Sequence, residues 1–355
     1  MTREDLVLVA MVGVLVASGV LAVWWTSRLR VRANEIRWPA KLGLSALTTL
    51  LCVATALLGL ELFYRFVYDA TDSFALTKTS LRWFERHYRY NSWNVRDDVE
   101  YAVAKTPGRR RIAFLGDSFT VGHGVPDVGE RFANRIRTAH PEWEVHVLAR
   151  NGLDTGAQLA LMEATFARGY ETDDLVLVYC LNDIGDLLPD WRAVIDGLYE
   201  EVSAAGFLVH HSYAVNQLYF RLLRVTTPQL DGYFPRLRAA YEGEVWHRQA
   251  QRLAALAELA KQHDARFAVA TFPFVHALGP DYPFEEAHRR LAALWQSLGV
   301  PHLDLRDAFA DVPPASLVVN ADDAHPNETA HALAAEALAA FLRDDADGTE
   351  PAALQ

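Results

Sequence analysis

The chain has 355 residues, a formal net charge of -11 at pH 7 and a hydrophobic fraction of 51%. This length fits one sizeable catalytic domain plus a smaller part. The negative charge argues against a nucleic-acid partner, because phosphate binding relies on clustered Lys and Arg, and the C-terminal region shows no basic face. Of the two cysteines, Cys52 lies in an apolar segment and Cys180 ends an expected buried strand, so their positions indicate neither a disulfide nor a redox compartment.

Two apolar runs near the N-terminus predict membrane-spanning helices at about residues 6–25 and 42–66. The first run carries no charge, and at about 1.5 Å per residue it crosses a hydrocarbon core about 30 Å thick. A cleaved signal peptide is the alternative, but acidic residues stand beside Arg3 and no small-residue cleavage site follows Trp25. Residues 1–68 are therefore expected to form a transmembrane hairpin in contact with a lipid bilayer.

The loop between these helices is basic and short. It holds Arg28, Arg30, Arg32, Arg37 and Lys41 against a single acidic residue, Glu35. Because basic loops of this kind stay in the cytoplasm, both termini and the C-terminal domain are expected on the extracytoplasmic side, periplasmic or outer. Beyond the second helix, the aromatic residues Phe63, Tyr64, Phe66 and Tyr68 form either an interfacial belt or a packing surface for the next domain.

The rest of the chain changes character twice. Residues 69–109 lack a clear period and are interpreted as a connector that packs on the domain after it. From residue 110 to 343, short apolar runs alternate with amphipathic segments, which predicts strands alternating with helices around a parallel sheet buried on both faces. The expected strands are 111–115, 144–148, 175–180, 267–271 and 302–305; the expected helices are 131–139, 157–167, 245–261, 284–298 and 328–342.

The stretch 184–242 is too long for a plain crossover between strands. Its helix-like segment 213–223 is expected to form either a cap over the site or a surface insertion. The last residues, 344–355, are expected to be a polar tail.

Four polar junctions carry the chemistry, since ligands of open parallel sheets bind beyond the carboxyl ends of the strands. Gly116-Asp117-Ser118 places a hydroxyl at a strand-to-helix turn, and Asn151-Gly152 offers a backbone amide after the second strand. Asn182 follows the third strand, and Asp322-Asp323-Ala324-His325-Pro326 stands near the C-terminus. Taken singly, each has a purely structural alternative: a helix cap, a turn or a loop histidine.

Together, the four blocks resemble the SGNH (GDSL) hydrolases of the membrane-anchored bacterial type. The resemblance runs from about the first strand to the last helix and does not include the hairpin. Cys180 departs from the pattern, because the family commonly has glycine there. The resemblance implies an α/β domain with a three-layer, flavodoxin-like arrangement around a central parallel sheet.

The resemblance also implies roles. Ser118 would attack a carbonyl, His325 would be the general base and Asp322 would orient the His325 ring, with Asp323 a solvated neighbour. The backbone amides of Ser118 and Gly152 and the side chain of Asn182 would be the oxyanion donors.

The remaining histidines suggest no further chemistry. His123 could line the pocket, but a polar loop residue is the preferred interpretation. No cofactor and no metal are expected, since His210 and His211 have no carboxylate or cysteine at ligand spacing. An α/β-hydrolase is disfavoured because Ser118 is followed by Phe119-Thr120 and not by the x-Gly of Gly-x-Ser-x-Gly.

These residues predict a serine esterase that removes an O-acyl group, such as acetyl, from an extracytoplasmic glycan or lipid through an acyl-serine intermediate. One alternative is an O-acyltransferase that passes the acyl group to a cell-envelope or secreted polysaccharide, with a membrane acyl-donor protein as partner. A second is a catalytically silent, membrane-bound binding module. The presence of nucleophile, base, acid and two donor positions counts against the second alternative.

Overall fold

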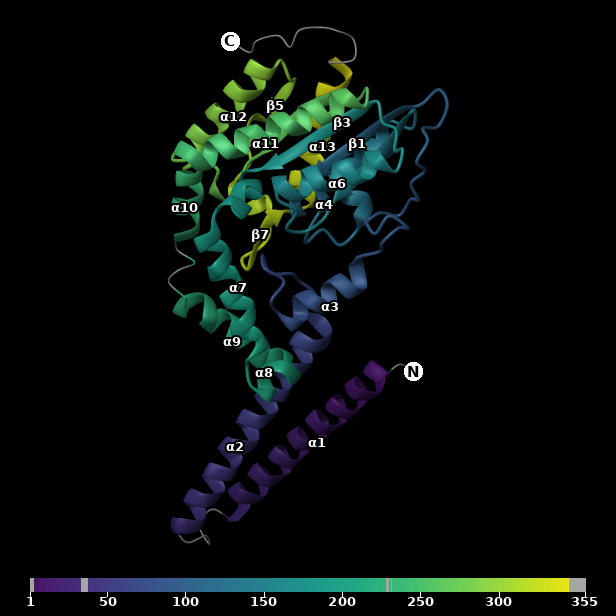
Figure 1. Ribbon diagram of the computed structural model, residues 1–355. Coiled ribbons are helices and arrows are strands. Elements are labelled where there is room, and N and C mark those ends of the chain that lie inside the picture. Colours follow the sequence, from purple (N-terminus) through teal and green to yellow (C-terminus); the bar gives the residue numbers. More distant parts are fainter. Residues whose placement is uncertain (1–2, 33–37, 228–229, 231, 345–355) are drawn as a thin grey trace. The chain divides into compact units, whose positions relative to one another are not determined.

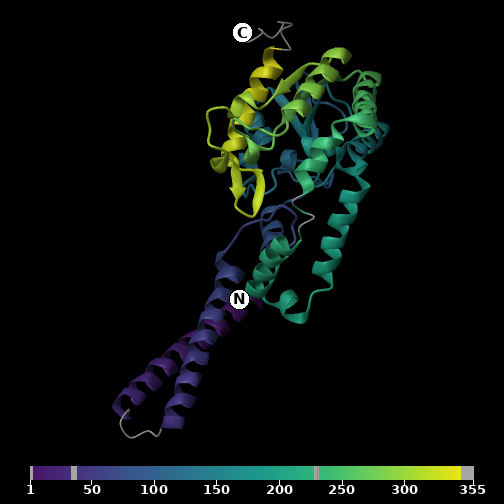
Figure 2. The same cartoon turned by 90° about the vertical axis from the view of Figure 1, so that its left-hand side faces the viewer.

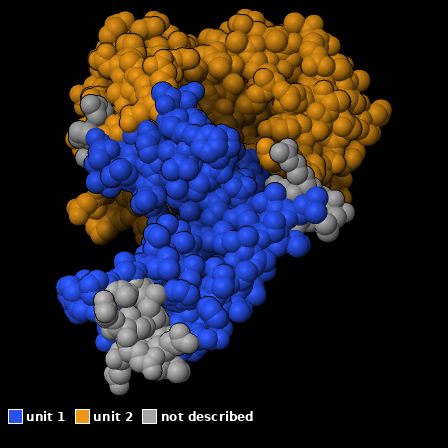
Figure 3. All heavy atoms as spheres, turned by 90° about the horizontal axis from the view of Figure 1, so that it is seen from below, with its two compact units in different colours: residues 1–70, 76–83, 202–226 blue, residues 71–75, 84–201, 227–355 orange. Residues whose placement is uncertain are grey.

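The computed structural model describes residues 3–32, 38–227, 230 and 232–344. It divides into two compact units, coloured in Figure 3. Unit 1 comprises residues 1–70, 76–83 and 202–226, and unit 2 comprises residues 71–75, 84–201 and 227–355. Part of the predicted basic loop (33–37) and most of the predicted polar tail (345–355) lie outside the described residues.

Unit 1 is built on two long helices, α1 (Arg3–Arg32) and α2 (Trp38–Leu62), which pack side by side in Figure 1. By length and composition, the segments Leu6–Arg28 and Lys41–Val67 could span a membrane, and neither is buried by the rest of the chain. The helices extend beyond the predicted apolar runs. The reason is that Arg is a good helix former, so the basic residues that follow the first run continue α1 instead of starting a loop.

A π-helical turn, η1 (Phe63–Val67), follows α2, and the Tyr68 N–H donates to the Phe63 carbonyl at 2.8 Å. Unit 1 also contains the start of α3 (Lys78–His87), together with α8 (Phe207–His211) and α9 (Tyr213–Thr226). Part of the predicted 184–242 insertion therefore groups with the N-terminal helices.

Unit 2 contains a five-stranded parallel sheet in the order β2-β1-β3-β4-β5. The strands are β1 (Arg110–Gly116), β2 (Trp143–Ala149), β3 (Asp174–Cys180), β4 (Arg266–Phe272) and β5 (His302–Asp304). All five predicted strands are confirmed. Every residue of β3 is buried, as expected for a central strand covered on both faces.

Helices cover both faces of this sheet, since α5 packs with α13 and α6 packs with α11 (Figure 2). This arrangement confirms the predicted α/β class with a central parallel sheet. The α-helices are α4 (Ser118–Val121), α5 (Phe132–Ala139), α6 (Thr155–Ala167), α7 (Pro189–Ser203), α10 (Tyr233–Ala240), α11 (Gly243–Gln262), α12 (Glu285–Leu298) and α13 (Glu328–Asp344). Short 3-10 helices lie at Val128–Glu130, Leu181–Leu187, Val275–Ala277, Asp307–Phe309 and Pro314–Ser316.

A second, two-stranded antiparallel sheet joins β6 (Val318–Asn320) and β7 (Asp323–Pro326). The sequence patterns did not predict this small sheet, which carries the histidine of the expected site.

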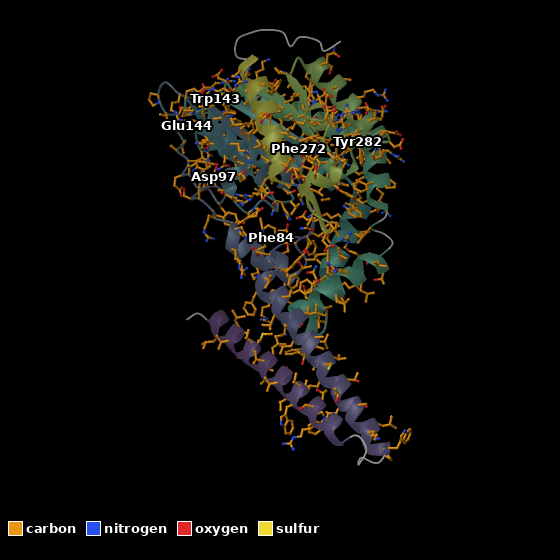
Figure 4. The ribbon with its side chains drawn as sticks, turned by 180° about the vertical axis from the view of Figure 1, so that it is seen from behind. Phe84, Asp97, Trp143, Glu144, Phe272 and Tyr282 are labelled. Atoms are coloured by element: carbon orange, nitrogen blue, oxygen red, sulfur yellow. The ribbon has the colours of Figure 1, made fainter. Side chains whose placement is uncertain are left out.

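The segment before β1 belongs largely to unit 2 and is anchored by buried charges. The Asp97 carboxylate, labelled in Figure 4, accepts from Arg137 at 2.7 Å and lies 3.2 Å from an Arg131 nitrogen. The side chains of Asp97 and Arg131 are 0% exposed. Burial raises the pKa of Asp97, but the two guanidinium groups more than offset burial and hold it well below its usual range.

Candidate active site

Ser118 is the first residue of α4, and only Asp117 separates it from the end of β1. The Asp117 carboxylate caps this helix by accepting from the Phe119 N–H at 2.9 Å. Gly116 is required by close packing, because a Cβ added there would lie 2.1 Å from the Thr120 hydroxyl oxygen. The tight turn thus leaves the Ser118 hydroxyl at the carboxyl edge of the sheet, where sequence patterns placed it.

His325 lies in β7 and contacts Ser118 across the fold. Its Nε2 atom is 2.9 Å from Ser118 Oγ, and its Nδ1 atom is 2.6 Å from Asp323 Oδ1. A carboxylate only accepts, so Nδ1 carries the proton and donates to Asp323. Nε2 is then free to accept from the Ser118 hydroxyl.

The acidic partner of the histidine is Asp323, and the expectation that Asp322 orients the ring is wrong. The two candidates differ in backbone position: Asp323 starts β7, whereas Asp322 lies in the turn before it. Side chains two residues apart on a strand point to the same face, so Asp323 and His325 project together. The Asp323 side chain is 0% exposed and is therefore not the solvated neighbour expected from the sequence.

Two further side chains hold the second oxygen of Asp323. The Thr71 hydroxyl donates to Asp323 Oδ2, and His123 Nε2 lies 3.2 Å from the same atom. His123 also stacks on His325, with ring centroids 4.0 Å apart and planes 14° apart. His123 is therefore part of the site, and its interpretation as an ordinary loop residue is wrong.

The loop that carries His123 is shaped by its glycines. Gly124 has φ +82°, and a Cβ there would lie 2.4 Å from Val319 of β6. Glycine thus lets the loop approach the small sheet closely. Gly122, also at positive φ, ends α4, and the His123 N–H donates back to the Ser118 carbonyl at 3.0 Å. The Val-Gly-His-Gly pattern was the one sequence signal that could have identified His123.

The electrostatics shift the pKa values of the two stacked histidines in opposite directions. Burial lowers the pKa of His325, but the neighbouring Asp323 charge outweighs burial and raises that pKa above its ordinary value. For His123, burial and the nearby His325 lower the pKa despite the contact with Asp323. Burial raises the pKa of Asp323, yet His325 and the hydrogen bond from His123 hold it well below its usual range. The site thus combines His325, whose proton affinity is raised, with His123, whose proton affinity is lowered, around an ionised Asp323 carboxylate.

Two buried carboxyl groups, those of Asp117 and Asp183, lie at and beside the turn that carries Ser118. Burial raises the pKa of Asp117, although hydrogen bonds from Phe119 and Asn182 work in the opposite direction. Burial and the charge of Asp117 raise the pKa of Asp183 well above its usual range. Asp183 accepts from the backbone N–H of Cys180 at 3.2 Å. Burial likewise raises the pKa of the Cys180 thiol well above its usual value, so Cys180 is a packed residue without nucleophilic character.

The two remaining predicted donors follow β2 and β3, the strands on either side of β1. Asn182 is half-buried in the 3-10 helix after β3, hydrogen bonded to Asp117, with its Oδ1 atom buried and unpartnered within the described residues. Gly152 lies in the exposed turn after β2 with φ +72° and open space where a Cβ would be. Gly116 of β1 pairs with Ala149 of β2, so the turns after these strands lie at the same sheet edge.

A pocket of about 250 Å³ opens on the β2 side of this edge. Tyrosine rings and polar side chains dominate its lining. The lining residues are Tyr88, Tyr90, Asn94, Arg96, Val121, Ala149, Arg150 and Asn151.

Among the described residues, one group has potential metal-ligand spacing: His123, Asp323 and His325, whose ligand atoms lie within 4.8 Å of one another. Each of these atoms already takes part in the hydrogen bonds described above. The group therefore fits a Ser-His-Asp relay better than a metal centre.

Comparisons with known proteins agree with this geometry. The profile of the GDSL-like lipase/acylhydrolase family matches residues 114–333, which is more than half of the chain and includes Ser118 and His325. No curated protein sequence matches the chain.

Several solved structures are similar at low identity. The crystal structure of TesA is 15% identical, with a TM-score of 0.41, covering 66% of this chain and 98% of that one. The psychrotrophic esterase EstA from Pseudoalteromonas sp., inhibited by monoethylphosphonate, is 14% identical, with a TM-score of 0.40 and coverages of 67% and 99%. A catalytic mutant of Axe2, an acetylxylan esterase from Geobacillus stearothermophilus, is 15% identical, with a TM-score of 0.41 and coverages of 70% and 98%. On the strength of the family profile, the chain belongs to the GDSL-like lipase/acylhydrolase family, and it is an SGNH-type serine hydrolase.

Proposed function

We propose that this chain is a membrane-anchored serine esterase that cleaves an O-acyl ester, such as an O-acetyl ester, of an extracytoplasmic glycan or lipid. Ser118 is the nucleophile, His325 the general base and Asp323 the residue that orients the base. The observation that carries this proposal is the continuous relay from Ser118 Oγ to His325 Nε2 at 2.9 Å and from His325 Nδ1 to Asp323 at 2.6 Å.

The relay accounts for both halves of ester hydrolysis. Ser118 Oγ bonds to the carbonyl carbon while His325 Nε2 takes its proton, and the carbonyl electron pair moves onto oxygen. The tetrahedral intermediate collapses, the C–O bond to the alcohol breaks, and the leaving oxygen takes the proton from His325. Water then attacks the acyl-serine with His325 again as base, which releases the carboxylic acid and restores Ser118.

The developing oxyanion requires preorganised donors. The backbone N–H groups of Ser118 and Gly152 and the side-chain amide of Asn182 are the groups we assign to this role, since all three follow strand ends at one edge of the sheet. The hydrogen bond from Asn182 to Asp117 supports the assignment, because it fixes the amide beside the nucleophile turn.

The substrate class rests on two features. The helices α1 and α2 anchor the chain in a bilayer, and the basic residues between them favour an extracytoplasmic catalytic unit. The pocket beside Asn151 presents tyrosine rings with Asn side chains and Arg150, a lining that suits a sugar hydroxyl face better than a long acyl chain.

The proposal is tested by active-site labelling of the purified full chain. We expect a fluorophosphonate probe to label the protein, Ser118→Ala to abolish labelling, and Ser297→Ala on exposed α12 to leave it unchanged. With p-nitrophenyl acetate, Ser118→Ala should lower kcat by about 10⁴-fold or more. Labelling and hydrolysis that survive Ser118→Ala would overturn the proposal.

Hydrolysis and acyl transfer share the same acyl-serine, so they need a separate measurement. The acetylated enzyme is offered oligosaccharides at increasing concentration, and free acetate and acetylated sugar are both quantified. We expect free acetate to dominate. Acetylated sugar that rises with acceptor until it exceeds acetate would replace the esterase with an O-acyltransferase that uses a membrane acyl donor.

A further inference from the structure

Helices α8 and α9 expose large apolar side chains on a surface that the described residues leave uncovered. On α9, Leu218, Leu222 and Val225 are 69%, 58% and 83% exposed. They stand at positions i, i+4 and i+7 and therefore form one stripe along the helix. In α8, Phe207 and Leu208 are 71% and 63% exposed. We call these five residues the α8–α9 apolar set.

This exposure is not explained by packing of α9 within unit 1, because the helix buries a different face. The buried residues are Asn216, Gln217, Phe220 and Leu223. A helix with one buried face and a second, exposed apolar stripe has a further binding surface, since exposed apolar groups of this size mark contacts with protein or membrane.

The charge of residues 202–227 helps to distinguish a membrane from a protein partner. The whole chain has a net charge of -11, yet residues 202–227 contain no Asp or Glu. They contain Arg221 and Arg224, both exposed on either side of Leu222 in the sequence, together with His210 and His211. An apolar stripe flanked by Arg on a helix of an otherwise acidic protein is typical of a helix that lies on an anionic lipid surface.

The position of α9 along the hairpin supports the same partner. The Glu61 carboxylate of α2 accepts from Ser212 Oγ at 2.7 Å and from the backbone N–H groups of Tyr213 at 3.1 Å and Ala214 at 2.9 Å. Arg65 donates to the same carboxylate and to the His211 carbonyl. The first turn of α9 is therefore fixed to the last turn of α2, and the two helices pack against each other.

The length of α2 places this junction at a membrane interface. From Leu42 to Glu61, a helix rises by about 30 Å, which is the thickness of a bilayer hydrocarbon core. Glu61 then lies where the acyl chains meet the headgroups, and so does the start of α9. The aromatic residues of η1 come next in the chain, at the membrane depth where aromatic belts occur. The rings of Phe63 and Tyr64 meet edge to face, with their centroids 5.2 Å apart.

We propose that α8 and α9 form a lipid-binding surface that lies on the anionic leaflet next to the hairpin. The α8–α9 apolar set enters the acyl-chain boundary, and Arg221 and Arg224 meet lipid phosphates. The inference rests on the proposed membrane anchoring and extends it. The insertion between β3 and β4 of the hydrolase thus provides a third membrane contact besides α1 and α2.

The test measures the depth of single residues in vesicles. The full chain with Cys52→Ser is reconstituted into vesicles of phosphatidylcholine and phosphatidylglycerol, and the environment-sensitive fluorophore NBD is attached at Leu222→Cys. Leu57→Cys in α2, which is exposed from the protein, is the control for membrane insertion. Gln296→Cys on α12, which is exposed in unit 2, is the control for water. The remaining cysteine, Cys180, is buried and should not react.

We expect brominated lipids to quench the labels at positions 57 and 222 and aqueous iodide to quench only the label at 296. Iodide quenching at 222 equal to that at 296 would overturn the proposal. So would a label at 222 that is shielded from both quenchers, because this result identifies a protein partner or a second copy. If lipid quenching is lost at position 57 as well, the proposed membrane anchoring by α2 is contradicted. Fluorophosphonate labelling of Ser118, measured on the same samples, tests the proposed esterase separately.

The role of charge is tested in the same vesicles. For the chain labelled at position 222, we expect bromolipid quenching to be stronger with phosphatidylglycerol than with phosphatidylcholine alone. The double variant Arg221→Gln/Arg224→Gln should lose this difference while keeping Ser118 labelling. A difference that persists in the double variant would contradict the contact with lipid phosphates.

Discussion

Asp323 and His325 project from the same face of strand β7, and Asp323 Oδ1 lies 2.6 Å from His325 Nδ1. The neighbouring Asp322 is held in another way: its backbone carbonyl accepts from the Ser73 N–H at 3.1 Å in the turn before the strand. Two adjacent aspartates therefore have different environments, and this difference is directly testable.

Asp323→Asn should lower kcat for p-nitrophenyl acetate by about 10⁴-fold, because an amide at this position favours the wrong tautomer of the base. Asp322→Asn is the matched control, one residue away, and should leave kcat close to that of the unchanged enzyme. Steady-state kinetics on both variants decide the assignment. A large loss in Asp322→Asn with normal activity in Asp323→Asn would restore the acid expected from the sequence.

The pH profile should have its acidic limb above the ordinary histidine pKa. His325 must be neutral to accept the Ser118 proton, and Asp323 raises the pKa of His325. As pH falls through that raised pKa, kcat/KM should fall. Asp323→Asn removes the charge that raises the pKa, so the acidic limb of the residual activity should move to lower pH. A limb that stays in place, or moves to higher pH, would mean that another group controls it.

His123→Phe should keep the stacked ring on His325 but remove the contact with Asp323. A hydrogen bond to a charged group contributes about 1.5–3 kcal/mol, so we expect kcat to fall by about 10- to 100-fold. KM should change little, since His123 orients the acid and is not assigned to substrate binding. His210→Phe, at an exposed histidine in unit 1, serves as the control. Unchanged kcat in His123→Phe would make the histidine a packing residue only.

Asn182→Ala should lower kcat by about 10²–10³-fold if its amide stabilises the oxyanion. Asn182→Asp keeps the shape but replaces the donor with an acceptor, so it should be at least as inactive. Circular dichroism and fluorophosphonate labelling at long times check that both variants fold. An Asn182→Ala variant within a few-fold of normal kcat would limit Asn182 to its contact with Asp117.

Asp97→Asn should destabilise unit 2 by about 3–5 kcal/mol, because it leaves the buried Arg131 without its full counter-charge. The matched control is Asp98→Asn, whose side chain is 60% exposed and pairs with the same Arg137. That surface pair should contribute about 0–1 kcal/mol. Urea unfolding followed by tryptophan fluorescence measures both. Equal losses of unfolding free energy in the two variants would show that the buried Asp97 cluster stabilises the protein no more than the surface pair does.

Local patterns in the sequence were sufficient for the sheet and for two site residues. The apolar run 175–180 is typical of a strand buried on both faces, and Ser118 and His325 stand in short blocks whose spacing is characteristic. The acid was not accessible in this way, because choosing between Asp322 and Asp323 depends on whether β7 begins at residue 322 or 323. That start is set by pairing with β6, which leaves no clear local signal.

The contacts that hold Asp323 in place were even harder to predict from the sequence. Thr71 and His123 are distant from Asp323 in sequence, and their contacts exist only once the loop 122–124 packs on the small sheet. The grouping of residues 202–226 with the N-terminal helices is also a long-range outcome. Sequence periodicity reports burial along one element and does not report which distant element provides the cover.

The Thr71 hydrogen bond to Asp323 makes residues before the family-matched region part of the catalytic unit. Residues 71–75 follow the hairpin almost at once, yet they belong to unit 2, and besides Thr71 they supply the Ser73 hydroxyl, which accepts from the Ala324 N–H at 3.0 Å. Residues 71–75 thus hold strand β7 in place, although they precede the family-matched region by some 40 residues. A protease that cut between residues 71–75 and β1 would leave the full SGNH signature intact but would loosen Asp323. Cleavage outside the family-matched region would then be enough to inactivate the enzyme.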